Sequence, residues 1–550
     1  MKSLTFIAAG LALGLPQTFA APSKSQIKWG KCNLDWGKDT DDALYAEVEC
    51  ATLKAPLDYT KPNNGKTIDL QLARVKAKTQ PAKGSVFYNP GGPGSSAVEY
   101  VVSSTESYYQ VLGGQYNLVA VDPRGTGRTL PFNCSIEDDE ESEKKASKSK
   151  RSRRWDVLPQ ANLWPTFKGQ TWDQLGEWAD QCYKARKETG ALIGTAFSAR
   201  DIMTAVDALG EDGKLRYWGI SYGTVLGQTL AGMFPDRIDR MVLDGVVMID
   251  EYVMGLNPSL VKDTERALLQ LVADCVDSGP ELCKLADWAG SNTTAEILTT
   301  AISDVWTELI KLPKIPKEWG LPKEAEYFQG GASFLASIKS HIQQTLYSPN
   351  DFGDLMDFLE KMLNGEWKEV YEILNSSEDE EEQAEKWNWG EDALSGIYCS
   401  DQAYRAETVD DFYSAWALHS EQSSFSDIGA EGELNCARWP FKAAETIDMN
   451  KFKHVNTKMP ILFVNSRYDP ITPLVSAYEA STRFNGSRVV VHEGYGHGVH
   501  GNPSLCTYTA IADYFKKGRL PRPGVTCPVS TPIFQQLRNT EIARNKTESA

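Results

Sequence analysis

Gly219-Ile220-Ser221-Tyr222-Gly223 is the stretch that decides the fold of this chain, because of what surrounds it. Residues 215–218 before it read as a short buried strand, and residues 224–234 after it read as a helix rich in small side chains. A serine between glycines at a strand-to-helix turn is typical of a nucleophile elbow, since glycines allow the tight bend that exposes the hydroxyl. The alternative, a glycine-lined surface turn, leaves the small residues behind the serine unexplained. The sequence therefore predicts that Ser221 is a nucleophile.

Other short apolar runs also end on polar or glycine-rich turns. They are residues 84–88, 116–121, 240–243, 459–464 and 488–491. Runs of this length, separated by helical segments, indicate a parallel sheet that is buried on both faces. The site of such a sheet lies beyond the carboxyl ends of its strands. We expect an α/β fold with a mostly parallel central sheet and an inserted, mainly helical cap domain.

The long interval between the runs at 240–243 and 459–464 carries the expected cap. It is rich in helix formers and tryptophan, and its acidic run at 378–382 predicts a surface loop. An acidic run followed by a basic run at about 135–155 is typical of a solvated, mobile excursion. The expected organisation is a signal peptide at 1–20, a first core segment at 21–250, a helical cap at 251–450, a C-terminal core segment at 451–530 and a tail at 531–550.

The N-terminus has the pattern of a secretory signal peptide. Met1-Lys2 supplies positive charge, residues 4–15 form an apolar run, and small residues lead to a cleavage point after Ala20. The run is shorter than the roughly 20 residues that a membrane span needs. We therefore expect a secreted, extracellular protein.

The ten cysteines fit an exported protein. Their number is even and none stands in a C-x-x-C spacing, so we expect disulfides and no metal site. Pairing of each cysteine with its neighbour along the chain is our hypothesis, because spacing alone leaves the connectivity open. Five N-x-S/T sequons predict glycosylation. They are at Asn133, Asn292, Asn375, Asn485 and Asn545.

The net charge of the chain argues against some classes of binding partner. It carries 57 Lys and Arg against 74 Asp and Glu, a formal net charge of −17. This excess argues against nucleic acid and an anionic membrane as partners. We expect no cofactor, and a monomer is the default state.

A serine hydroxyl becomes a good nucleophile when a positioned base removes its proton. Of the six histidines, His497 lies in a glycine-rich loop after the run at 488–491 and is the expected base. His500 is the alternative, and His492 is expected to be structural. Activity should fall below about pH 5 to 6, as the imidazole of His497, with a reference pKa near 6.5, takes up a proton.

The base needs a carboxylate that orients it. Asp469 follows the run at 459–464 in a turn stiffened by prolines, and the order Ser, Asp, His is expected after a nucleophile elbow. Asp244, after the run at 240–243, is the alternative acid, or a turn aspartate bonded to its own backbone. We favour Asp469.

Acyl transfer also needs donors for the oxyanion. The backbone N–H of Tyr222 is one candidate, and the glycine loop after the early strand supplies the other. Gly92 is the expected donor in that loop and Gly91 the alternative, while a simple Pro-Gly turn is the competing interpretation. The arrangement predicts acyl-transfer chemistry.

Several motifs together resemble those of the α/β-hydrolase exopeptidases, namely the prolyl iminopeptidases and, more closely, the secreted tripeptidyl aminopeptidases. The resemblance covers about residues 30–530, is weakest in the cap, and includes a TAP-like C-terminal part. Asn89-Pro90 stands where prolyl iminopeptidases usually have histidine, which favours the tripeptidyl branch. The motifs are Asn89-Pro-Gly-Gly-Pro-Gly94, Asp122-Pro-Arg-Gly-Thr-Gly127, Gly219-Ile-Ser-Tyr-Gly223, Ile397-Tyr-Cys-Ser-Asp401, Asp469-Pro-Ile-Thr-Pro473 and Gly496-His497.

The resemblance implies a serine peptidase that removes short peptides, such as tripeptides, from free N-termini. Recognition of the substrate ammonium then needs carboxylates in the cap, for which Asp401 is a candidate, and the competing interpretation is that Asp401 caps a helix. The alternative is a carboxylesterase acting on small esters, because the same triad cleaves both bonds. A binding protein on an inactive hydrolase scaffold is a third hypothesis, against which the intact Ser, Asp and His argue.

Overall fold

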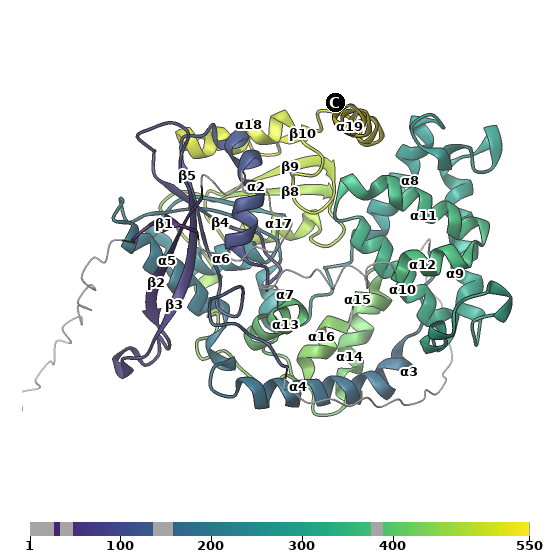
Figure 1. The fold of residues 1–550 in the computed structure, drawn as a ribbon, viewed down its shortest axis with the longest axis horizontal. Coiled ribbons are helices and arrows are strands. Elements are labelled where there is room, and N and C mark those ends of the chain that lie inside the picture. Colours follow the sequence, from purple (N-terminus) through teal and green to yellow (C-terminus); the bar gives the residue numbers. More distant parts are fainter. Residues whose placement is uncertain (1–26, 33–47, 136–157, 376–388, 430, 549–550) are drawn as a thin grey trace, which may run out of the picture.

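The computed structural model describes residues 27–32, 48–135, 158–375, 389–429 and 431–548 (Figure 1). The expected signal peptide, the acidic run at 378–382 and all but the first residue of the charged excursion lie outside these ranges. Within them, no helix combines the length and the apolar character needed to cross a membrane.

One ten-stranded sheet forms the centre of the α/β part, in the order β1-β2-β3-β5-β4-β6-β7-β8-β9-β10. All neighbours from β5 onward in that order pair in parallel. Only β1, β2 and β3 run antiparallel to their neighbours. The mostly parallel sheet is therefore confirmed. The strands are Gly30–Lys31, Val48–Pro56, Thr67–Val75, Ser85–Asn89, Asn117–Val121, Leu215–Ile220, Ile238–Asp244, Leu462–Tyr468, Arg488–Tyr495 and Thr526–Pro528.

The antiparallel pair β2 and β3 extends the sheet beyond the expected strands. Along β2, Ala51, Leu53 and Ala55 are buried while Thr52 and Lys54 are exposed. This alternation is the signature of a half-buried strand, and it was present in the sequence.

Helices cover both faces of the sheet (Figure 1). On one face α2 (Ala97–Leu112) and α18 (Leu505–Lys517) share a hydrophobic core with the strands. On the other face α5 (Thr195–Leu209), α6 (Tyr222–Met233) and α17 (Leu474–Thr482) do the same. A parallel sheet needs such cover on both sides, because its strands are apolar on both.

A buried ion pair anchors the turn after β5 to α5. The Arg124 guanidinium and the Asp201 carboxylate are 2.6 Å apart, with side chains 0% and 1% exposed. Arg124 also donates to the backbone oxygens of Pro56, Leu57 and Leu192, so its donors are used inside the core. Breaking such a pair on one side leaves an uncompensated buried charge.

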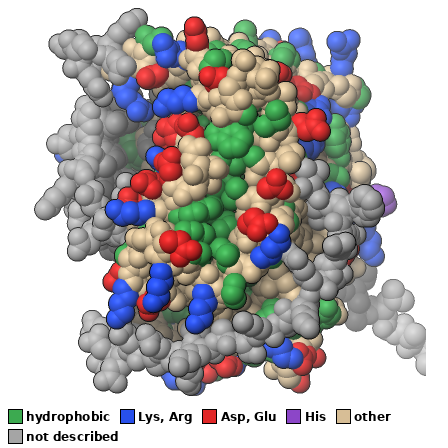
Figure 2. Space-filling view, turned by 90° about the vertical axis from the view of Figure 1, so that its right-hand side faces the viewer, with side chains coloured by type: hydrophobic (Ala, Val, Ile, Leu, Met, Phe, Trp, Pro, Cys, Tyr) green, Lys and Arg blue, Asp and Glu red, His purple; other side chains and the backbone are tan. Residues whose placement is uncertain are grey.

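The described residues between β7 and β8 lie mostly in helices, as expected of the cap. Helices α8 to α12 share a second hydrophobic core, which also takes in Tyr495 at the end of β9 and Ile533 and Phe534 of α19 (Ile533–Glu548). Figure 2 shows the outer side of the molecule that lies to the right in Figure 1, where a band of hydrophobic side chains runs between acidic and basic ones. The helices here are α7 Ile249–Met254, α8 Thr264–Ser278, α9 Ala295–Lys311, α10 Gly331–Thr345, α11 Phe352–Asn364, α12 Trp367–Asn375, α13 Gly390–Asp401, α14 Val409–Ser420, α15 Ser426–Gly429 and α16 Glu431–Ala437.

Three further helices lie outside that segment. Helices α3 (Trp164–Thr166) and α4 (Trp172–Arg186) precede α5, and α4 packs against α16. The stretch expected to be a C-terminal tail is helical, as α19 (Ile533–Glu548), and it packs against α8.

All ten cysteines form disulfides, and each pairs with its neighbour along the chain, which confirms that hypothesis. The pairs are Cys32–Cys50, Cys134–Cys182, Cys275–Cys283, Cys399–Cys436 and Cys506–Cys527.

Candidate active site

Ser221 occupies a strained turn between β6 and α6. Its φ and ψ are 56° and −126°, and apart from Leu130 it is the only described non-glycine residue with a positive φ. A Cβ on Gly219 would lie 2.3 Å from the Gly223 carbonyl oxygen, and one on Gly223 would lie 2.6 Å from the Asn89 carbonyl oxygen. A side chain at either position would clash with a backbone oxygen, which explains the G-x-S-x-G pattern. Backbone strain of this kind is typical of functional sites.

His497 and Asp469 form a hydrogen-bonded pair at the ends of neighbouring strands. His497 Nδ1 lies 3.1 Å and 3.0 Å from the two carboxylate oxygens of Asp469, which directly follows β8. Asp469 is fully buried and also accepts from the backbone N–H groups of Ile471 and Thr472, at 3.0 Å and 2.8 Å. The Thr472 hydroxyl donates to Asp469 at 2.7 Å and lies 3.2 Å from His497 Nδ1. The carboxylate is thus held in one orientation toward the imidazole.

Ser221 and His497 both lie next to the end of β7. The Ser221 N–H donates to the Asp244 carbonyl oxygen at 3.1 Å. A Cβ on the next residue, Gly245, would lie 3.2 Å from His497 Cε1. The carboxylate on His497 Nδ1 is that of Asp469, so Asp244 does not take the role of the orienting acid in this arrangement.

The electrostatic surroundings favour the protonated form of His497. Burial lowers its pKa, but the charge and hydrogen bond of Asp469 and the charge of Asp244 raise it, and the net result lies above the usual value of 6.5. The imidazole should therefore take up its proton at a higher pH than the 5 to 6 expected from the sequence.

The two other histidines near the C-terminal strands are buried and have other partners. Burial lowers the pKa of His492 and of His500 to about 4 in each case. His492 Nδ1 lies 3.0 Å from the Thr507 hydroxyl, and the His500 ring is stacked on Trp218. In this structure neither ring is paired with Asp469, unlike that of His497.

The glycine loop after β4 lies directly against the elbow. A Cβ on Gly91, whose φ is +110°, would lie 2.6 Å from Ser221 Cβ and 3.1 Å from the backbone nitrogen of Tyr222. The Gly91 N–H already donates to Asn89 Oδ1 at 3.1 Å. Gly92 is the next residue along the loop with a backbone N–H, and its role as an oxyanion donor stays a prediction.

Asp401 is buried and bonded within the protein. Its carboxylate accepts from the backbone N–H of Thr195 at 3.0 Å and from its hydroxyl, and from the Tyr252 hydroxyl at 3.0 Å. Thr195 is the first residue of α5, and its hydroxyl lies 2.6 Å from that of Tyr222. Burial raises the pKa of Asp401 to about 6. Asp401 therefore caps a helix, as the alternative interpretation held, and through Thr195 it supports the side chain that follows the nucleophile.

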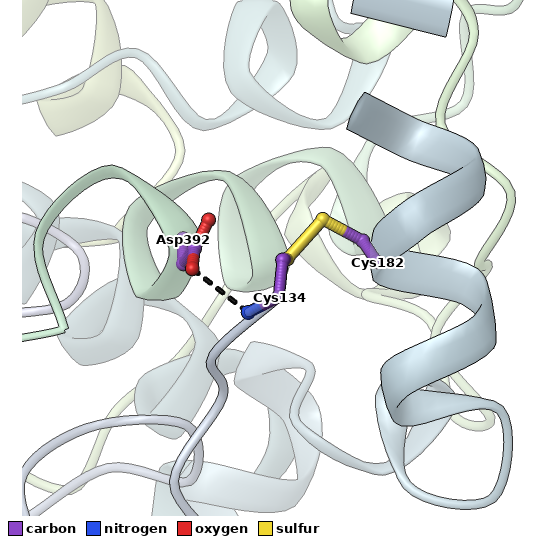
Figure 3. Close-up of side chains that lie close together, drawn as sticks. All are labelled: Cys134, Cys182 and Asp392. Atoms are coloured by element: carbon purple, nitrogen blue, oxygen red, sulfur yellow. Dashed lines mark hydrogen bonds between the residues drawn. A yellow bond between two sulfur atoms is a disulfide. The ribbon is translucent and has the colours of Figure 1, made fainter. Parts of the chain in front are cut away.

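Cys134, Cys182 and Asp392 place two sulfurs and a carboxylate close together (Figure 3). The sulfurs are joined in a disulfide, so neither offers the thiolate that a metal ion needs. The Asp392 carboxylate instead accepts from the Cys134 N–H at 2.8 Å and from the Trp178 indole at 3.2 Å. This group is structural.

A buried polar cluster in the cap was not found from the sequence. We call Asn257, Tyr398, His419 and Glu433 the cap cluster. Asn257 Nδ2 donates to the Tyr398 hydroxyl at 2.6 Å and to Glu433 Oε1 at 3.3 Å. Glu433 Oε2 lies 3.6 Å from His419 Nε2, and both side chains are 1% exposed. Neither Glu433 Oε2 nor either His419 ring nitrogen has a hydrogen-bond partner among the described residues.

The fold and the residues at the ends of its strands are those expected of a serine hydrolase, and comparison with known proteins tests this expectation. Residues 84–274 match the family described as alpha/beta hydrolase fold, and residues 422–527 match the family described as TAP-like protein. The chain therefore has the α/β-hydrolase fold, and it is a serine hydrolase.

Curated relatives match nearly the whole chain. Over 532 residues it is 28% identical to the tripeptidyl aminopeptidase of Streptomyces lividans, covering 95% of this chain and 90% of the relative. Over 513 residues it is 26% identical to serine protease Hip1 of Mycobacterium tuberculosis, covering 92% of each chain. Over 532 residues it is 26% identical to carboxylesterase B of the same species, covering 94% and 92%. The relatives thus include both peptidases and an esterase.

Proposed function

We propose that this chain is a secreted aminopeptidase that releases tripeptides from free N-termini through an acyl-enzyme intermediate on Ser221. The observation that carries the proposal is the His497–Asp469 pair beside the strained serine. Similarity to enzymes named tripeptidyl aminopeptidase and serine protease supports the choice of a peptide bond as substrate.

In the proposed reaction, Ser221 Oγ attacks the carbonyl carbon of the scissile bond and His497 Nε2 accepts the hydroxyl proton. Nε2 is free for this task, because it has no hydrogen-bond partner among the described residues while Nδ1 is held by Asp469. The N–H groups of Tyr222 and Gly92 donate to the oxyanion. His497 then gives its proton to the leaving amine, and water hydrolyses the acyl-enzyme with His497 again as base.

We assign recognition of the free amine to Glu433 in the cap cluster. A peptide ammonium offers three donors and a positive charge, which complement a buried carboxylate oxygen that lacks a hydrogen-bond partner. Burial makes this interaction strong, because a charge-assisted hydrogen bond is stronger in surroundings of low dielectric constant. The competing explanation is a structural pair with protonated His419.

An aromatic path links the cap cluster to the nucleophile. The ring of Tyr222, next to Ser221, lies 6.0 Å from that of Tyr252, which lies 5.3 Å from that of Tyr398 in the cluster. These two ring contacts connect the cluster to the residue that follows Ser221.

The first test compares a chromogenic tripeptide amide carrying a free N-terminus with its N-acetylated twin. The Ser221→Ala variant serves as the blank. Cleavage of the free-amine substrate alone is the expected result. Equal cleavage of both substrates would remove amine recognition from the mechanism.

An esterase is the second candidate function, because one relative is named carboxylesterase B. A small chromogenic ester distinguishes the two. Good turnover of the ester with no cleavage of either peptide would establish the esterase, and Ser221→Ala should abolish it as well.

Secretion is supported by the leader pattern at 1–20 and by the five disulfides. Two of the sequon asparagines, Asn292 and Asn485, are exposed and open to glycosylation. Expression of the full chain in a eukaryotic secretion host tests this. We expect enzyme in the medium, with a mass that falls after enzymatic deglycosylation, and retention in the cell would contradict it.

A further inference from the structure

A second carboxyl group lies beside the base, and the proposed mechanism does not use it. Asp244 ends β7 and is fully buried. A Cβ on Gly498, the residue after His497, would lie 3.7 Å from each of its carboxyl oxygens. The Val499 N–H and the Trp218 indole face the group, yet neither carboxyl oxygen has a hydrogen bond of good geometry among the described residues. Burying a carboxyl group without good hydrogen bonds costs free energy of folding, so its presence here calls for a functional explanation.

The titratable groups around Asp244 come from four elements. His497 follows β9 and Asp469 follows β8, while Tyr108 lies on α2 and Tyr508 on α18. In this set only His497 can carry a positive charge. His500 also lies in this region, stacked on Trp218, but burial lowers its pKa to about 4. The cation that the charge of Asp244 stabilises is therefore the imidazolium of His497 that forms during the reaction.

We propose that Asp244 is a positioning residue that stabilises the imidazolium form of His497, in addition to Asp469. The proposal rests on the proposed function, because it concerns the base of that reaction. Asp469 fixes the tautomer of the imidazole through Nδ1. Asp244 makes no such hydrogen bond with the ring. It acts through its negative charge, which lies next to the loop that carries His497.

The protonation equilibria are consistent with this role. Burial raises the pKa of Asp244 to about 7, the charge of His497 lowers it, and the charge of Asp469 raises it. In return, Asp244 raises the pKa of His497. The protonation of each group thus depends on that of the other. When the serine proton reaches His497, the new positive charge favours the ionised form of Asp244.

Removing the negative charge of Asp244 should change both kcat and the pKa of His497, each in a known direction. The imidazolium becomes less stable, so kcat falls. The pKa of His497 falls as well, so the acid limb of kcat/KM moves to lower pH. An opposite charge nearby shifts a pKa by one unit or more, and one unit is a factor of ten, so we expect a limb about one pH unit lower and a kcat about tenfold lower.

The test is the pH profile of the full-length chain with the ester and with the free-amine peptide. Asp244→Asn should lower the acid limb, whereas Asp122→Asn should leave it in place. Asp122 is a matched control, since it is also a buried carboxyl directly after a strand, but it accepts from Ser96 and Val98 at the start of α2. If the acid limb of the Asp244→Asn profile stays at the wild-type pH or moves to higher pH, the proposal is wrong.

The outcomes separate this proposal from the proposed function. If Ser221→Ala keeps full activity, the proposed mechanism fails. If Ser221→Ala is inactive and Asp244→Asn keeps the wild-type limb, only the role of Asp244 fails. Thermal melting shows whether each variant folds, and Asp244→Ser, a smaller uncharged replacement, carries the same test if Asp244→Asn does not fold. A merely structural role would lower the melting temperature without moving the limb.

Discussion

Replacement of Gly91 by alanine tests the tight contact between the glycine loop and the nucleophile elbow. The new Cβ would lie 2.6 Å from Ser221 Cβ and 2.7 Å from the Ile220 carbonyl oxygen. Carbon atoms in contact prefer about 3.5 to 4.0 Å, so the loop and the elbow must separate by about 1 Å. A misplacement of about 1 Å at the reacting centre can cost about 10²-fold in rate, and this is the loss of kcat that we expect for Gly91→Ala.

Gly65→Ala is the matched control. Gly65 also has a positive φ, of +70°, but no atom lies within 4 Å of its added Cβ. It therefore carries the conformational cost of alanine, about 1 to 2 kcal/mol, without a clash at the site. Both variants are compared with wild type by kcat on the tripeptide amide and by thermal melting. A kcat of Gly91→Ala within about threefold of wild type would refute the reasoning, because it would show that the contact does not position the serine.

Three further changes follow from contacts described above. Asp469→Asn should lower kcat by about 10³- to 10⁴-fold in protein that still melts cooperatively, because the amide no longer fixes the tautomer of His497; near-normal kcat would contradict the pair. Glu433→Gln should raise KM for the free-amine tripeptide about 10- to 100-fold, the worth of a charge-assisted hydrogen bond, and leave ester turnover unchanged; an equal effect on both substrates would indicate a structural role. Arg124→Met should lower the free energy of unfolding in urea by about 3 to 5 kcal/mol, since it leaves the buried Asp201 carboxylate without a positive partner, and adding Asp201→Leu should recover much of that loss.

Most of the site could be predicted because its chemistry stands at the ends of strands. Asp469 directly follows β8, and His497 lies just beyond β9. In a parallel sheet these ends meet at one edge, so a local pattern of apolar run and polar turn is enough to bring distant residues together. The choice of Asp469 over Asp244 also depended on the turn chemistry around it, which the backbone N–H groups of Ile471 and Thr472 now explain.

The rest depends on contacts between segments that no local pattern connects. Thr195 begins α5, yet the carboxylate that caps that helix belongs to Asp401 at the end of α13. Glu433 on α16 and His419 on α14 meet only through the tertiary arrangement of the cap helices. Helix propensity predicts such helices but not which of their faces meet, so the cap cluster could not be derived from the sequence.

The pairing of the cysteines bears on how the chain is made. Every disulfide joins consecutive cysteines, and the longest spans 48 residues, between Cys134 and Cys182. A chain entering an oxidising compartment from its N-terminus can close these bonds one after another, in the order in which the cysteines arrive. No correct bond has to wait for a distant partner, and no wrong bond has to be reduced on the way. Oxidative folding of this chain should therefore depend little on disulfide isomerisation, although the α/β sheet and the core of the cap are completed only when their last strands and helix emerge.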